Sequence, residues 1–341
     1  MSNDRGLICA YLLDGQGGGT ALDWAGVEAW RPDEGVLWMH LDRSDFDARR
    51  WLRDTSGIDS IIVDSLLAKG SRPRTTVIGQ SLLVFLRGIN LNPERDPVHM
   101  VSMRMYAEEK RVVTIRRQHL MAVDDVKDSL EEGDGPLDAG DLLIAVAGAL
   151  TERMRPKLTE LKEELEALEE DLENSDYGPV RPRLAGIQRE TIELRRYLAP
   201  QREALSYLCT TEIPWLTGRE RMRLFEVIDQ IKRYVENLDA GREHAQVLHE
   251  QISENLNQKI NRNMYLLSIM AAVFLPLDFV TGLLGVNLGG IPGQDNPLGF
   301  LELTIGLAFF AVFLLAIFHR LQWLRPLQRS SPAAQEDSAP Y

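Results

Sequence analysis

Two apolar runs toward the end of the sequence constrain the fold of this chain most strongly. The first covers residues 264–284 and is almost free of charge, and the second covers residues 298–318. About twenty residues at roughly 1.5 Å each are long enough to cross a hydrocarbon core of about 30 Å. The loop between them, residues 285–297, is too short for a domain. The sequence therefore predicts a transmembrane hairpin that follows a large soluble body.

The first span carries one carboxylate, Asp278. A charged side chain facing lipid costs roughly 2.5–3.5 kcal/mol on insertion scales, so this aspartate is expected inside protein or beside water. Pro276 removes a backbone donor, which leaves the carbonyl of Ala272 free to face water or to bend the helix. At about 100° per residue, six positions share one stripe of the helix: Met264, Ser268, Ala271, Leu275, Asp278 and Gly282. The stripe favours a pore lining; the alternative is that Asp278 hydrogen-bonds to a neighbouring helix and Pro276 is only a bend.

Composition limits the classes of function. The chain has 341 residues, with 51 Asp and Glu against 38 Lys and Arg, which gives a net charge of −13. An acidic balance argues against nucleic acid as a partner and is compatible with a protein that gathers cations. The sequence contains no phosphate-binding loop, dinucleotide fingerprint or nucleophile elbow. Nothing therefore predicts an enzyme, and no cofactor is expected.

Residues 1–137 are expected to form a cytoplasmic α/β domain. Four segments are rich in branched and aromatic residues with turn formers between them, which predicts strands at 36–41, 76–86, 98–106 and 111–115. Residues 57–68 alternate in the helical manner. Together these patterns indicate a mixed sheet with helices, and a regulatory or assembly role is the default interpretation.

Residues 138–262 are expected to form a helical stalk domain. Segments 141–172 and 183–208 carry leucine-rich stripes and are predicted to pair as an antiparallel hairpin. A third helix begins near Gly218 and continues into the first span, because no proline interrupts it before Pro276. The apolar seam of this helix is satisfied most simply by copies of itself, so we expect a symmetric homo-oligomer.

Basic residues set the expected orientation in the lipid bilayer. They flank both spans and are absent from the loop: Lys259, Arg262, Arg320, Arg325 and Arg329. By the positive-inside rule, both termini and the soluble body are expected in the cytoplasm and the loop outside. The transmembrane region with its basic flank is thus 263–329, and residues 330–341 are expected to be disordered.

The tripeptide Gly285, Val286 and Asn287 ends the first span. Gly and Asn are also favoured at a helix C-terminus and a tight turn, which is a purely structural explanation. The run FLPLDF at 274–279, this tripeptide and a second span together resemble the CorA family of divalent-cation transporters, whose signature at this place is Gly-Met-Asn. Val286 in place of Met, with GGIPG at 289–293, is similar to the zinc-transporting ZntB branch of that family. In the soluble domain, SRPR at 71–74 and LRGINLNP at 86–93 resemble the same branch.

The resemblance implies a CorA-like homopentameric funnel in the inner membrane of the cell, multi-pass, with the first spans around a central pore. Asn287 would form a ring at the outer mouth and contact the hydrated ion, Gly285 would allow the turn, and Val286 completes the selectivity tripeptide. Asp278 would add an acidic ring, while Met264 and Leu275 would be apolar constrictions. Zinc is the favoured transported cation, and proton coupling is left open.

The pore chemistry alone does not select zinc. Dehydrated Zn²⁺ prefers Cys, His and carboxylate ligands, but neither span supplies a Cys, or a His before His319. His244 and His249 on the long helix are secondary metal candidates; they lie five residues apart and do not share a face well, so solvated stalk positions are the competing interpretation. A magnesium, cobalt or nickel channel of the broader family is the nearest alternative. A membrane-anchored scaffold without transport is the second.

Overall fold

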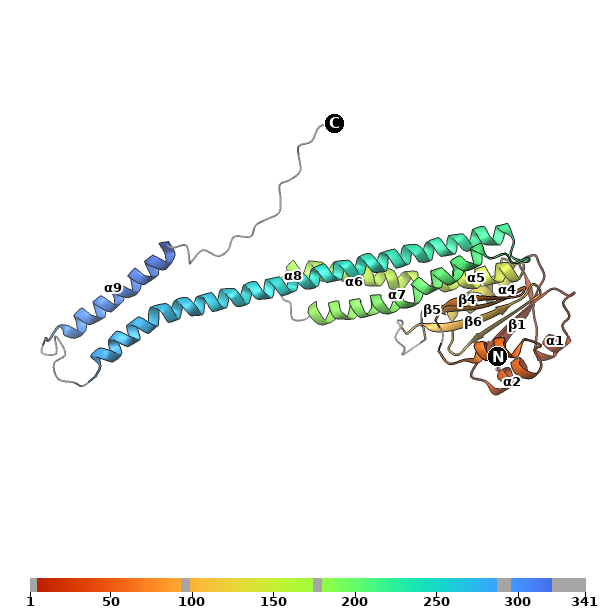
Figure 1. Ribbon diagram of the computed structural model, residues 1–341, viewed down its shortest axis with the longest axis horizontal. Coiled ribbons are helices and arrows are strands. Elements are labelled where there is room, and N and C mark those ends of the chain that lie inside the picture. The colour runs from red at the N-terminus through yellow and green to blue at the C-terminus, as the bar shows by residue number, and fades with distance from the viewer. Residues whose placement is uncertain (1–4, 71, 93–98, 174–179, 287–295, 321–341) are drawn as a thin grey trace, which may run out of the picture. The chain divides into compact units, whose positions relative to one another are not determined.

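The computed structural model describes residues 5–70, 72–92, 99–173, 180–286 and 296–320. The chain divides into two compact units, Met1–Glu250 and Gln251–Tyr341. Figure 1 shows the elements, which are in chain order β1 (Leu7–Leu13), β2 (Gly19–Ala21), α1 (Trp24–Ala29), β3 (Val36–Asp42), α2 (Phe46–Asp54), α3 (Ser60–Leu67), β4 (Arg74–Ile78), β5 (Ser81–Gly88), β6 (Val101–Ala107), β7 (Arg111–Arg116), α4 (Met121–Glu132), α5 (Ala139–Glu152), α6 (Arg155–Glu173), α7 (Val180–Thr210), α8 (Gly218–Leu284) and α9 (Gly299–Arg320).

The strands form one seven-stranded sheet in the order β2-β1-β3-β7-β6-β5-β4. Among the described strand pairs, β3 with β7 is parallel and the others are antiparallel. A parallel pair needs a crossover connection, and here it contains α2, α3 and the three strands β4 to β6. The prediction of an α/β domain with a mixed sheet is confirmed.

The predicted strand segments hold with one correction, and two strands, β1 and β2, were not predicted. Segments 36–41, 98–106 and 111–115 correspond to β3, β6 and β7, and the helix predicted at 57–68 is α3. Segment 76–86 is wrong as a single strand, because the chain reverses between Ile78 and Ser81, which pair with each other. Gly79 in this turn has a φ of 62°, a conformation that glycine adopts without strain. Strand β1, which the sequence analysis omitted, is an apolar run without the polar alternation that marks a half-exposed strand.

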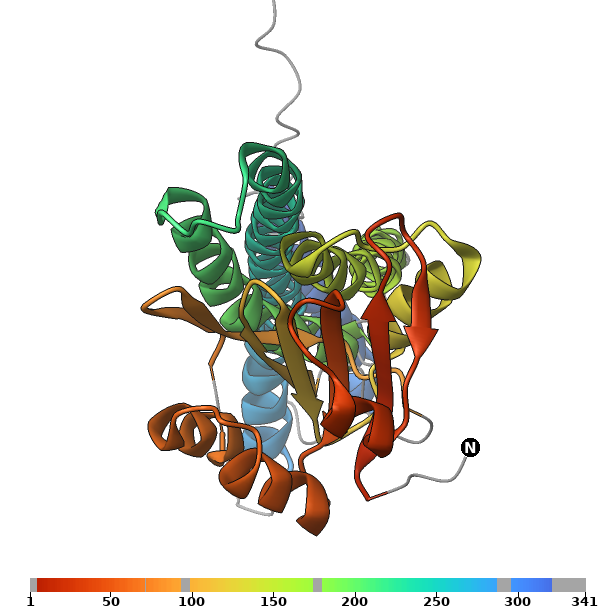
Figure 2. The ribbon, with the colours of Figure 1, turned by 90° about the vertical axis from the view of Figure 1, so that its right-hand side faces the viewer.

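The sheet is covered by helices on both faces. On one face, Leu41, Phe85 and Ile115 belong to a core that also includes apolar side chains of α2 and α3. Figure 2 shows these two helices in orange on one side of the sheet and the yellow helices α4 and α5 on the other. Because side chains alternate along each strand, neighbouring residues enter different cores.

The second face contains a buried polar network. Trp38 Nε1 donates to Thr114 Oγ1 at 2.9 Å, and that hydroxyl donates to Met39 O at 3.0 Å. Arg116 Nε donates to His40 Nε2 at 3.0 Å, so the proton of the imidazole lies on Nδ1, which donates to Thr114 Oγ1 at 2.8 Å. Burial and the adjacent Arg116 charge place the pKa of His40 well below its ordinary value. The network therefore holds a neutral histidine.

The helix predicted over 141–172 is two helices, α5 and α6, which is a correction. Pro156 is the second residue of α6. A proline is tolerated in the first turn of a helix, where its missing N–H has no helical acceptor, but it breaks a helix interior. Pro156 therefore marks the start of α6, and this proline could have predicted from the sequence that 141–172 is two helices.

Helices α6 and α7 pair antiparallel, as predicted. Near the start of α6, Lys157 Nζ lies 2.9 Å from Glu190 Oε2. At its other end, Asp171 Oδ2 lies 2.9 Å from Arg183 NH1, near the start of α7. The earlier residue of α6 thus pairs with the later residue of α7 and the later with the earlier, which is the order of antiparallel helices.

Helix α8 runs for 67 residues without a break and contains Pro276, as predicted (Figure 1). Its predicted apolar seam is buried within this single chain from Leu224 to Leu248. The helices of the same unit therefore cover this part of the seam. The seam of this part therefore gives no reason of its own to expect an oligomer, because side chains of the same chain already bury it.

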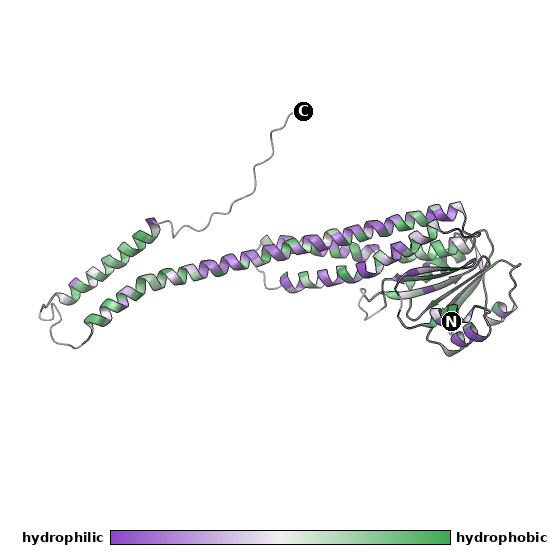
Figure 3. Ribbon diagram, viewed as in Figure 1, coloured by the Kyte–Doolittle hydropathy of each residue, from purple (hydrophilic) through white to green (hydrophobic). Residues whose placement is uncertain are grey.

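Two helices in the described part of the chain, α8 and α9, are long and apolar enough to cross a membrane. Figure 3 shows apolar residues predominating in α9 and in the last part of α8. Only 6% of the apolar window in α8 and 0% of that in α9 is buried. These are therefore not core helices of a soluble protein.

Candidate functional site

The predicted pore stripe lies on one uninterrupted stretch of α8. All six of its positions are exposed in the single chain: Met264, Ser268, Ala271, Leu275, Asp278 and Gly282. Phe279, which is off the stripe, is also 70% exposed. A single chain therefore does not distinguish a pore-lining side from a lipid-facing side, and the assignment rests on the chemistry of the side chains.

Hydroxyl groups of the span bind the helix backbone. Ser268 Oγ donates to Met264 O at 2.8 Å, and Thr281 Oγ1 donates to Asp278 O at 3.1 Å. A hydroxyl that donates to the preceding turn still presents its lone pairs outward. The Asp278 carboxylate forms no ion pair with any described residue. The stretch thus presents oxygen acceptors, which is the donor set that hydrated or hard cations prefer.

The end of α8 is built around Gly285. Its N–H donates to Thr281 O at 2.9 Å. A Cβ at this position would lie 3.0 Å from the same carbonyl oxygen, and the backbone of Gly285 is not left-handed. Close approach to the last turn, more than an unusual φ, therefore favours glycine here. Val286 follows and is 44% exposed, whereas Asn287 lies outside the described residues.

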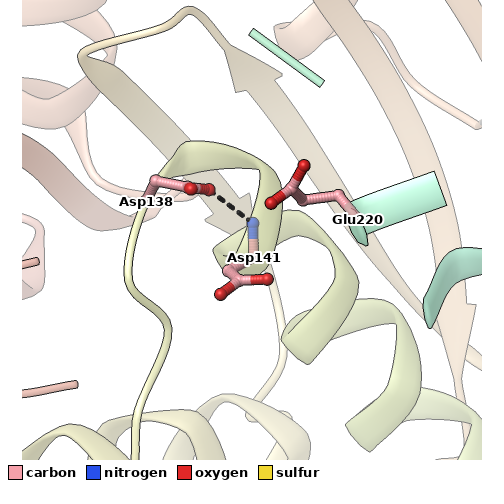
Figure 4. Close-up of side chains that lie close together, drawn as sticks. All are labelled: Asp138, Asp141 and Glu220. Carbon is pink, nitrogen blue, oxygen red and sulfur yellow. Dashed lines mark hydrogen bonds between the residues drawn. The ribbon is translucent and has the colours of Figure 1, made fainter. Parts of the chain in front are cut away.

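The described residues contain one group of three acidic side chains with the proximity that a metal site needs: Asp138, Asp141 and Glu220 (Figure 4). Asp138 caps α5, since its Oδ1 accepts from the N–H of Asp141 at 2.8 Å. Asp141 is 2% exposed, and its Oδ1 lies 2.6 Å from Arg223 NH1. Burial raises the pKa of Asp138, with the charge of Asp141 contributing.

Glu220 has partners in a capping box at the start of α8. Its Oε2 accepts from the N–H of Thr217 at 2.7 Å and from the Thr217 hydroxyl. Burial opposes the charge on Glu220, but the hydrogen bonds from Thr217 outweigh it and the pKa is lowered. The three carboxylates meet because two helix N-termini meet, and this group has a structural explanation. No prediction from the sequence included this group, although Asp-x-x-Asp and Thr-x-x-Glu are both patterns of a helix start.

The secondary metal candidates do not form a cluster in the described part of the chain. His244 Nε2 lies 3.1 Å from Glu169 Oε2 on α6. Neither His244 nor His249 belongs to the group of three carboxylates. Burial raises the pKa of Cys9 to about 12, so this thiol stays protonated and is a poor metal ligand.

Comparison with known proteins agrees with the resemblance found in the span. The sequence model of the family described as CorA-like Mg²⁺ transporter protein matches residues 33–320. The divalent cation transporter CmaX of Pseudomonas aeruginosa is 40% identical over 326 residues, which cover 94% of this chain and 98% of CmaX. The zinc transport protein ZntB of Pectobacterium atrosepticum is 36% identical over 319 residues, covering 94% of this chain and 96% of ZntB.

A solved structure is similar over nearly the whole chain. The structure of full-length CmaX superposes with a TM-score of 0.83 at 39% identity, and the match covers 95% of this chain and 100% of that one. At this coverage the match includes the unit Met1–Glu250, called the soluble unit below, and the two apolar helices. The likeness therefore extends beyond a shared soluble domain.

Proposed function

Because the chain belongs to the CorA-like family of metal-ion transporters, we propose that it moves divalent cations across a membrane through a pore lined by α8. One observation carries the proposal: the match to CmaX and ZntB extends through both apolar helices, and the first of these helices bears an exposed carboxylate. The sequence gives no sign of an enzyme, and the relatives are transporters.

The pore requires several copies of the chain. One helix cannot enclose an aqueous path, and an exposed Asp278 facing lipid would cost roughly 2.5–3.5 kcal/mol on insertion scales. A closed ring of identical chains removes this cost, because each stripe then faces a common axis. We propose a homopentamer, with the second spans outside the first.

Each residue of the span has a proposed role. Asn287, with Gly285 and Val286, forms the outer collar that contacts the hydrated ion. Asp278 forms a ring of carboxylates that raises the local cation concentration. Apolar rings at Leu275 and Met264 close the path by excluding water, and the smaller Ser268, Ala271 and Gly282 widen it between them.

Zinc is the proposed substrate, supported by the similarity to ZntB over 94% of this chain. Magnesium is the second candidate, because the pore residues offer oxygen and no His or Cys within 264–318, and Mg²⁺ prefers oxygen ligands. The ions would pass at least partly hydrated in either case. Proton coupling would use the carboxylates of Asp278.

The proposed location is the inner membrane with both termini in the cytoplasm. The loop 285–297 contains no Lys or Arg, whereas both outer flanks of the hairpin are basic. This asymmetry supports an outward-facing loop by the positive-inside rule.

Flux into liposomes tests the function. Purified full-length chain would be reconstituted, and uptake of Zn²⁺, Mg²⁺ and protons followed with fluorescent indicators. We expect Asp278→Asn to lower divalent-cation flux at least about tenfold, because removing a ring of negative charge lowers the cation concentration within the pore by that order. Asn287→Ala is expected to reduce flux and to alter the ratio of Zn²⁺ to Mg²⁺.

Glu302→Gln is the matched control. Glu302 is an exposed carboxylate on α9, and its Oε2 accepts from Asn296 Nδ2 at 3.2 Å. The substitution removes the same charge from the other apolar helix, so flux should stay near that of the unchanged protein. A scaffold without transport would give equal background flux for all variants, and this outcome would refute the proposal.

A further inference from the structure

Arginines converge on one face of the sheet, at the edge where β3, β5 and β7 end. Arg74, Phe85 and Arg104 are directly opposite one another on β4, β5 and β6. Residues directly opposite on neighbouring strands share a face, so both arginines lie on the Phe85 side. Their guanidinium carbons are 4.1 Å (Arg74) and 5.3 Å (Arg104) from the centre of the Phe85 ring.

A second row of arginines lies two residues further along the same face. Arg87 is opposite Ser102 on β6, two residues beyond the pair of Phe85 and Arg104. At the ends of β3 and β7, the N–H of Arg43 donates to Arg116 O at 2.8 Å, and Arg117 follows Arg116. The residues Arg43, Arg74, Arg87, Arg104 and Arg117 are called the arginine patch below.

Contacts fix part of the patch in place. Arg43 NH1 donates to Ala68 O at 2.7 Å, and Arg104 NH1 donates to Leu66 O, so both bind carbonyls at the C-terminus of α3. Arg87 NH1 donates to Met100 O at 2.7 Å. Each guanidinium has five N–H donors, and the bonds that Arg43 and Arg104 make to described residues use only some of theirs.

Among the described residues, no carboxylate pairs with four of the five arginines of the patch. Within the described residues, Arg43, Arg74, Arg104 and Arg117 form no ion pair, and Arg74 and Arg117 make no hydrogen bond through their side chains. Burial, reinforced by the charges of Arg43, Arg74 and Arg87, lowers the pKa of Arg104 to about 10. The charges of Arg117 and Arg87 likewise lower the pKa of Arg43, after burial. Mutual repulsion of this kind is unexpected in a chain with a net charge of −13, in which carboxylates are abundant.

We infer that the arginine patch is a binding site for a phosphate group, free or carried by a nucleotide. Guanidinium groups offer forked donors that match phosphate oxygens, and a doubly charged anion relieves the repulsion among several arginines at once. A small anion can reach the exposed Arg74 and Arg117 and the half-buried Arg43, whereas Arg104, which is 2% exposed, contributes its charge without direct contact. The sequence segments SRPR and LRGINLNP contribute Arg74 and Arg87 to this site. The inference does not depend on transport, since the site lies in the soluble unit.

Calorimetric titration of the full-length protein in detergent tests the inference. The titrants are inorganic phosphate, ATP and adenosine at about 0.15 M salt, where exposed charges more than about 8 Å apart are screened. We expect Arg74→Gln with Arg117→Gln to weaken phosphate binding at least about tenfold, because each removes a charge-assisted donor. Both positions are exposed, so the protein should still fold. Tighter binding of ATP than of phosphate, with adenosine silent, would identify a nucleotide; equal binding would identify free phosphate.

The control removes the same charge elsewhere. Arg50→Gln with Arg53→Gln alters two exposed arginines of α2, which face Asp54 and Asp64 at 3.7 and 3.8 Å. Phosphate affinity should be unchanged. The inference is overturned if the unchanged protein gives no binding heat with phosphate or ATP, or if the control pair loses as much affinity as the patch pair. It is also overturned if the patch variant splits the assembly in sedimentation and leaves phosphate affinity intact, since carboxylates of another copy would then occupy the patch.

Discussion

The soluble unit and the apolar stretch of α8 that is expected in the membrane differ in how far they expose leucine side chains. Leu205 on α7 is fully buried, whereas Leu275 on α8 is 66% exposed. In the soluble unit the chain supplies its own apolar cover, including the cover for the seam of α8 from Leu224 to Leu248. In the apolar stretch of α8 almost every apolar side chain is exposed in the single chain, so only lipid or another copy can cover it. One part of the molecule therefore buries its apolar core within a single chain, whereas the apolar side chains of the other are left for lipid or further copies to cover.

The largest effect should come from truncating one buried leucine of the soluble unit and comparing it with one exposed leucine of the apolar stretch of α8. Leu205→Ala is expected to lower the free energy of unfolding of the soluble unit by about 2–5 kcal/mol, because it leaves a cavity in a packed core. Leu275→Ala should leave that free energy within about 0.5 kcal/mol and change cation flux instead. Urea unfolding followed by circular dichroism measures the first quantity, and liposome flux measures the second. Equal losses of stability in the two variants would contradict the comparison.

A smaller effect should appear on acidification, and only in the soluble unit. His40 is neutral when folded, with a pKa well below the ordinary value, and it titrates near pH 6.5 when unfolded. Below about pH 6.5, His40 takes up a proton in the unfolded state but stays neutral in the folded state. The free energy of unfolding should therefore decrease as the pH decreases below about 6.5, by up to about 1.4 kcal/mol per pH unit from this group.

Unfolding curves of His40→Gln and His119→Gln across pH 4.5–7.5 check this slope. His40→Gln should flatten it. His119→Gln should keep most of it, because burial is the main cause of the lowered pKa of His40 and the charge of His119 is the smallest of its three causes. An unaltered slope in His40→Gln would show that other groups cause the acid sensitivity. The pore stripe contains no histidine, so any pH dependence of flux should be separable from this effect.

The smallest effect should come from the two hydroxyls that bond to a helix. Thr217→Ala removes the hydroxyl that donates to Glu220 Oε2 in the capping box of α8, while the backbone N–H of residue 217 still donates to the same oxygen, and it should cost about 1 kcal/mol of soluble-unit stability. Thr304→Ala removes a hydroxyl of α9 that donates to Phe300 O at 2.8 Å and should not change that stability. Thermal unfolding of both variants compares them, and a loss in Thr304→Ala as large as in Thr217→Ala would argue against treating the two units separately.

Local patterns predicted the elements, whereas pairings between distant segments escaped them. Apolar length and helical periodicity were enough for the two spans and for the stripe that contains Asp278. The turn at Gly79 was overlooked because the segments on either side, 76–78 and 82–86, consist of strand formers. The arginine patch was invisible because Arg74 and Arg104, thirty positions apart, become neighbours only through the register of three strands. The collar role of Asn287 stays a prediction.

The sheet ends in two short strands, which has a consequence for self-association. β2 has three residues, and β4 has five and begins with Arg74. Open strand edges recruit strands from other molecules when they are long, flat and uncharged. These two edges are too short or too charged to pair well with a strand of another molecule. Newly made chains are therefore protected from fibrous aggregation before they reach a membrane, and their ordered association depends on helices.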